Sequence, residues 1–167
     1  MFPEKIIWVG FAVNLICSLW YVRSIFYGNT KPNLISWSIW SLAPFIGFFL
    51  ALKAGAGLSA VGIFMAGFGP LLVVISSFWK KNVFWKIQKL DIICGIFSVL
   101  AVIFYLTTYN LEISIIFALL SDLLAFVPIF VKSWKFPETE SVSTYAGGMI
   151  NNALALLIIK DWILAIY

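Results

Sequence analysis

The chain has 167 residues, of which 63% are hydrophobic and 11% are charged, and its mean hydropathy is +1.05. A soluble domain carries roughly 25% charged residues and about 45–50% apolar ones, so this composition excludes a water-solvated surface and predicts an integral membrane protein. The net charge of +4 comes from lysines that lie between apolar runs, which indicates membrane topology and not a nucleic-acid partner.

Long apolar runs divide the whole chain into segments that are bounded by charge, Gly or Pro. At about 20 residues for each spanning helix, they predict an all-α, polytopic transmembrane bundle. The six segments are approximately 6–26, 32–52, 58–79, 92–109, 111–133 and 142–159. The first is interpreted as a retained span, because its nearly neutral start and bulky end do not fit a cleaved signal peptide. Asn110 alone separates the fourth segment from the fifth and predicts a tight helical hairpin.

The distribution of Lys and Arg predicts the orientation. The loops of one side hold eight of these residues: Arg23, Lys31, Lys80, Lys81, Lys86, Lys89, Lys132 and Lys135. The other side holds three: Lys5, Lys53 and Lys160. Because cytoplasmic loops retain positive charge, we expect a multi-pass protein of the cell (plasma or inner) membrane with its N-terminus outside. The basic connector at 80–89 is expected to attract anionic headgroups.

The pattern of residues predicts an internal repeat. Residues 20–37, WYVRSIFYGNTKPNLISW, and residues 128–145, PIFVKSWKFPETESVSTY, lie 108 positions apart. Each segment leaves an apolar helix, crosses a basic loop that contains Pro, and enters the next helix through Ser or Thr and an aromatic residue. The copies would run parallel, as in one class of transporter. We expect a three-helix repeat at 1–79, a basic connector and inverting linker helix at 80–109, and a second, incomplete repeat at 110–167.

This plan, the stretch from Gly28 to Trp37 and its copy from Pro137 to Ser141 resemble the PQ-loop superfamily, in particular a bacterial branch of the group that includes the SWEET and SemiSWEET sugar facilitators. The resemblance implies a three-plus-one-three plan and alternating access for a small solute. The Pro-Gln pair of the family appears here as Pro128-Ile129 and as Trp20-Tyr21, and Tyr167 corresponds to Ser59, so the last helix of the plan is expected to be lacking.

Asp122 is the first candidate for solute binding. It lies near the middle of the fifth span, where a charged side chain costs roughly 2.5–3.5 kcal/mol, so we expect it to face the bundle interior or water. It would contact a solute or carry a coupled proton. In the alternative interpretation it is neutral, or is bonded to a neighbouring helix for packing. Asn14 lies 108 positions earlier, and helix packing alone also explains this amide.

The sixth span contains two adjacent amides, Asn151 and Asn152. Neighbouring side chains point about 100° apart on a helix, so at most one of the two can face a central cavity. Gly147 and Gly148 precede them and favour close helix packing.

Trp37 and Trp40 share one helix face and would stack on a sugar ring or belong to an interfacial aromatic belt. Pro44, Pro70 and Pro128 lie within spans, where a proline kinks its helix. They would be hinges for alternating access, although prolines are also common in membrane helices generally.

Several motifs are absent from the sequence. There is no His, no phosphate-binding Gly-rich loop and no nucleophile elbow, so we expect no enzyme activity, no cofactor and no metal. Cys17 and Cys94 lie inside apolar runs and are expected to be inert. The leading hypothesis is a small-solute transporter, with sugar as one substrate class and a lipid bilayer as the main partner. The alternative is a non-transporting binding or structural membrane protein, and a homo-oligomer stays open for both.

Overall fold

The computed structural model describes residues 3–53, 55–79, 85–108 and 111–158. These residues contain no strand, which confirms the all-α prediction. The helices are α1 (Ile7–Tyr27), α2 (Leu34–Lys53), α3 (Ala60–Trp79), α4 (Lys89–Thr107), α5 (Leu111–Lys135) and α6 (Ser143–Leu157), with short 3-10 turns η1 (Glu4–Ile6), η2 (Gly57–Ser59) and η3 (Pro137–Thr139). Asn110, Lys80, Lys81 and Lys160, on which the hairpin and charge predictions partly rest, lie outside the described residues.

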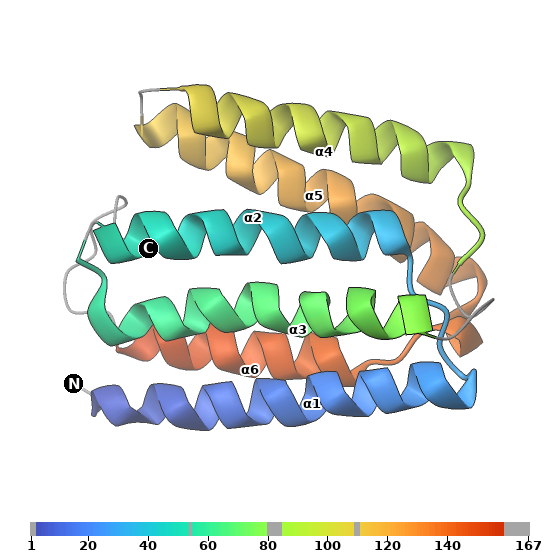
Figure 1. The fold of residues 1–167 in the computed structure, drawn as a ribbon, viewed down its shortest axis with the longest axis horizontal. Coiled ribbons are helices and arrows are strands. Elements are labelled where there is room, and N and C mark those ends of the chain that lie inside the picture. Colours follow the sequence, from blue (N-terminus) through green and yellow to red (C-terminus); the bar gives the residue numbers. More distant parts are fainter. Residues whose placement is uncertain (1–2, 54, 80–84, 109–110, 159–167) are drawn as a thin grey trace.

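The six helices lie side by side, and each runs antiparallel to the next (Figure 1). Helix α3 packs between α1 and α2, whereas α6 packs against α1 and α3. Helices α4 and α5 form a pair that contacts α2. This arrangement brings α1, α2, α3, α5 and α6 around a shared interior and leaves α4 at the edge.

Gly28 ends α1 in the left-handed conformation, with φ at 79°. The amides of Gly28 and Asn29 donate to the carbonyls of Ile25 and Ser24 at 2.9 and 3.1 Å, so the last turn of the helix is satisfied by its own chain. A residue with a Cβ is sterically strained in this conformation, whereas Gly is not. The chain then reverses through Pro32 into α2.

Small residues let the helices approach closely. A Cβ atom added to Gly147 of α6 would lie 2.5 Å from Cys17 Cβ of α1, and one added to Gly69 of α3 would lie 2.7 Å from Ser18 Oγ. In lipid, where the hydrophobic effect does not drive association, helices associate through close contacts of this kind.

Within the described residues, two helical segments are long and apolar enough to cross a membrane, judged by length and composition. They are Glu4–Tyr27 and Gly57–Trp79, and Leu34–Phe49 is a shorter apolar helix. The structure supports a membrane location to this extent, and the six spans stay a prediction.

Candidate functional site

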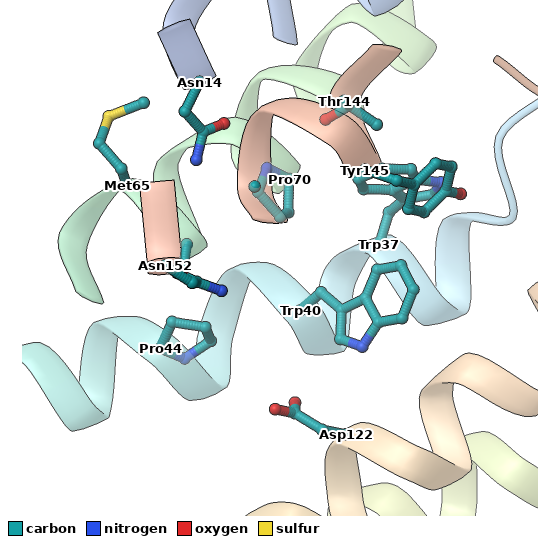
Figure 2. Close-up of a pocket in the computed structure, with 12 residues that line it drawn as sticks. Asn14, Trp37, Trp40, Pro44, Met65, Pro70, Asp122, Thr144, Tyr145 and Asn152 are labelled. Carbon is teal, nitrogen blue, oxygen red and sulfur yellow. The ribbon is translucent and has the colours of Figure 1, made fainter. Parts of the chain in front are cut away.

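A cavity of about 170 Å³ lies between five of the helices (Figure 2). It is lined by Asn14 of α1, by Trp37, Trp40 and Pro44 of α2, by Met65, Ala66 and Pro70 of α3, by Asp122 of α5, and by Thr144, Tyr145, Gly148 and Asn152 of α6. Polar groups therefore enter an otherwise apolar and aromatic space from three different helices.

Most of the residues singled out in the sequence meet at this cavity. It brings together Asn14, Trp37, Trp40, Asp122 and Asn152, together with two of the predicted hinge residues, Pro44 and Pro70. Two predicted residues do not line it: Asn151 lies in a helix contact, and Pro128 is buried within α5. The roles assigned to these residues stay predictions.

The cavity is also lined by both members of four residue pairs that are separated by 108 positions, the offset of the predicted internal repeat. The pairs are Asn14 with Asp122, Trp37 with Tyr145, Trp40 with Gly148, and Pro44 with Asn152. The helix packing has the same relation, because α1 packs on α6 as α2 packs on α5. Residues that correspond in sequence thus line one space.

The adjacent amides of α6 point in different directions, as expected. Asn152 lines the cavity, whereas Asn151 is fully buried and its Nδ2 donates to the carbonyl of Gly62 at 3.1 Å. Asn151 therefore joins α6 to α3. On α1, the buried Asn14 accepts a hydrogen bond from Ser18 Oγ at 3.2 Å through its Oδ1, and its side chain is directed toward the cavity (Figure 2).

Among the described residues that line the cavity, Asp122 is the one charged residue. Its side chain is exposed, and its carboxylate lies on the side of α5 that faces α2 (Figure 2). It makes no hydrogen bond or ion pair with another residue in the part of the chain that the structure describes. The carboxylate is therefore available to a solute or to water.

Three aromatic rings form one wall. The centroid of Trp37 lies 5.5 Å from that of Trp40 and 5.8 Å from that of Tyr145, and the Trp40–Tyr145 distance is 6.3 Å. The planes of Trp37 and Trp40 cross at 87°, so the rings present faces in different directions. Trp37 is only 2% exposed, which excludes it from a lipid-facing aromatic belt.

A buried ion pair lies at the end of the helix bundle next to Tyr145. Lys132 Nζ lies 2.6 Å from Glu140 Oε1, and the two side chains are 1% and 7% exposed. The other oxygen of Glu140 accepts hydrogen bonds from the hydroxyls of Tyr21 at 2.8 Å and Tyr145 at 3.3 Å. Lys132 also donates to the carbonyls of Lys31 and Thr139. We name this set of Tyr21, Lys132, Glu140 and Tyr145 the tyrosine–ion-pair network.

Sequence reasoning missed this network and several lining residues. Lys132 is expected in a loop, yet it lies within α5 and is buried. Tyr145 was detectable, because the repeat relates it to Trp37, whereas nothing in the sequence distinguishes Met65, Ala66 or Thr144 from ordinary packing residues. Among the described residues, no group of three or more His, Cys, Asp or Glu side chains is placed to hold a metal ion.

Comparison with protein-family models, with curated proteins and with solved structures found no match for the chain.

Proposed function

We propose that the chain is a six-span membrane protein that carries a small polar solute through the cavity by alternating access. The observation that carries the proposal is the cavity itself. Side chains of five helices line it, among them both members of four corresponding pairs and the Asp122 carboxylate, which has no partner among the described residues. Ligand sites in helical bundles are built in this way, from side chains on facing helices.

The outer surface supports a bilayer environment. Large apolar side chains are about half exposed along α4, including Ile92, Ile93, Ile96 and Phe97, and along α5, including Leu119 and Leu123. An apolar surface this extensive needs a partner or a lipid phase to cover it. In the proposed orientation, the N-terminus is outside and the basic ends of α1 and α5, with the connector before α4, face the cytoplasm.

The resemblance to the PQ-loop superfamily and the pairing of corresponding residues favour transport over a purely structural role. In alternating access, two helix groups rock around a fixed site. Tyr21, Trp37 and Tyr145 fill the basic end of the interior beneath the Lys132–Glu140 pair. We propose that this end is the closed cytoplasmic side, and that Pro44, Pro70 and Pro128 allow the bending that opens it.

The experiment is solute uptake into proteoliposomes that contain the purified protein. The probes are labelled glucose, alanine, choline and acetate, so that neutral, zwitterionic, cationic and anionic solutes are all represented. We expect saturable uptake of at least one probe. Gly148→Leu is expected to abolish it, because a Cβ on Gly148 meets no atom within 4 Å and the longer side chain would extend into the cavity.

The matched control is Ala153→Leu, which introduces the same leucine side chain at an exposed position of α6 that does not line the cavity. It should transport like the wild type. Absence of uptake across the panel by folded protein contradicts the proposal. Binding without uptake would instead support the non-transporting alternative.

A further inference from the structure

The chemistry of the cavity indicates which charge the solute carries. Among the described residues, Asp122 is the one charged residue that lines the cavity, and no basic residue does so. Lys132, on the same helix, is ten positions away, or about 15 Å along the axis, and it is already paired with Glu140. The field at the cavity is therefore that of an uncompensated carboxylate, which repels anions and attracts cations.

The aromatic wall favours the same charge. A cation is attracted to the face of an aromatic ring, most strongly to Trp, and aromatic cages are the usual recognition site for ammonium groups. The ring of Trp40 is inclined at 87° to Trp37 and at 80° to Tyr145, and Asp122 lines the same cavity from α5 (Figure 2). A cation in this cavity would meet both aromatic rings and a carboxylate.

The remaining groups set the size and the polarity of the solute. The amides of Asn14 and Asn152 offer neutral hydrogen-bonding groups. A cavity of about 150 Å³ is filled by benzene, so the volume of about 170 Å³ suits a molecule of similar size. A hexose has about twice as many non-hydrogen atoms as benzene and would extend beyond this volume.

We infer that the solute is a small organic cation, a primary or methylated ammonium compound held between the Asp122 carboxylate and the rings of Trp40 and Tyr145, with the buried Trp37 behind them. A neutral polyol would leave the carboxylate without a counter-charge, and a carboxylic acid would be repelled by it. The inference deepens the proposed function, because it names the solute class of the same cavity.

The test compares two molecules that differ only in charge. Choline and 3,3-dimethylbutan-1-ol have the same shape, with a quaternary nitrogen in one and a carbon in the other. Calorimetric titration of the purified protein in detergent measures binding of each without requiring transport. We expect choline to bind about tenfold more tightly or better, the size of a desolvated cation–aromatic contact.

Four variants separate charge from shape. Asp122→Asn preserves the side-chain size and should bring the ratio of the affinities for choline and the neutral alcohol close to one. Glu138→Gln removes an exposed carboxylate away from the cavity and should leave this ratio unchanged. Trp40→Leu should weaken choline binding more than binding of the neutral alcohol, and Trp40→Phe should restore part of the difference.

The outcomes separate this inference from the proposed function. A preference for choline below about twofold, or one that survives Asp122→Asn, overturns the inference. A neutral solute whose uptake depends on Asp122 and on a proton gradient also overturns it, because the carboxylate would then carry a proton. If choline binds and is not taken up, the inferred solute class stands and the proposed transport is contradicted. If solutes are taken up without a preference for cations, the proposed transport stands and the inferred solute class is contradicted.

Discussion

At the residue scale, the neighbouring glycines of α6 have opposite surroundings. A Cβ on Gly147 would lie 2.5 Å from Cys17 Cβ and 3.2 Å from Asn14 Cα, whereas a Cβ on Gly148 would meet nothing within 4 Å. Gly147 therefore sets the distance between α6 and α1, and Gly148 leaves space at the cavity. Their adjacency offers a matched pair of substitutions of identical chemistry.

We expect Gly147→Ala to destabilise the protein by about 1–3 kcal/mol, the usual cost of overpacking a close contact. Gly148→Ala should leave stability nearly unchanged. Thermal unfolding of both variants in the same detergent measures the difference. Equal melting temperatures would mean that the contact between α6 and α1 is looser than described.

Individual polar residues could be predicted from the sequence where they interrupt an apolar run. Asn14 and Asp122 stand out for this reason, because a polar side chain within a span must find the interior or water. Lys132 could not be recognised, since a lysine near the end of an apolar segment is ordinarily an exposed loop charge. Its burial depends on Glu140, which belongs to another part of the chain.

At the scale of the elements, the tyrosine–ion-pair network holds α1, α5 and α6 together through one carboxylate. Glu140 receives Lys132 from α5, Tyr21 from α1 and Tyr145 from α6. Removal of one partner leaves the other charge buried and uncompensated, which is more costly than removal of both.

We expect Lys132→Met or Glu140→Gln alone to cost about 3–5 kcal/mol of unfolding free energy. The double variant should cost clearly less than the sum of the single changes, because both charges are then gone. Lys135→Met, at an exposed position of the same helix, is the control and should have little effect. Denaturant unfolding of the four variants measures this coupling, and strictly additive costs would contradict it.

The apolar runs predicted the helices well, and the differences have polar causes. Helix α4 begins at Lys89, three residues before its apolar run, because Gln88 and Asp91 form a capping box. In this box the backbone N–H of Gln88 donates to the Asp91 carboxylate at 2.6 Å. Asn33 also donates to Asp91, at 2.9 Å. Helix α5 continues to Lys135, beyond the predicted end at residue 133. A hydropathy profile carries no information about such polar contacts between distant segments.

At the scale of the whole molecule, the basic residues gather at one end of the helices. Arg23 lies near the end of α1, Lys89 begins α4, and Lys132 and Lys135 lie at the end of α5. Lys5 lies at the opposite end, in η1. This distribution underlies the proposed orientation.

Single cysteines introduced at Lys5 and at Lys135, on a background without Cys17 and Cys94, would test that orientation. Both positions are exposed. In intact cells, a membrane-impermeant maleimide should label the cysteine at position 5 and leave the one at position 135 unlabelled until the membrane is opened. The reverse pattern would invert the proposed topology.

The cavity depends on the packing of the whole molecule, and the only sign of it in the sequence is the predicted repeat. The offset of 108 predicted which residues correspond, and four of these pairs meet in one space. It did not predict how α3 packs between α1 and α2, which brings Met65, Ala66 and Pro70 to the same place. The side chains that complete the lining follow from tertiary packing.

The burial of Lys132 has a consequence for the biogenesis of the protein. In the proposed orientation, this lysine is still unpaired while the nascent chain is inserted, and its charge would help retain the following loop on the cytoplasmic side of the membrane. After assembly, the same charge is neutralised by Glu140 and hidden from solvent. Replacing Lys132 would thus disturb two separate stages, the choice of orientation during synthesis and the stability of the finished bundle.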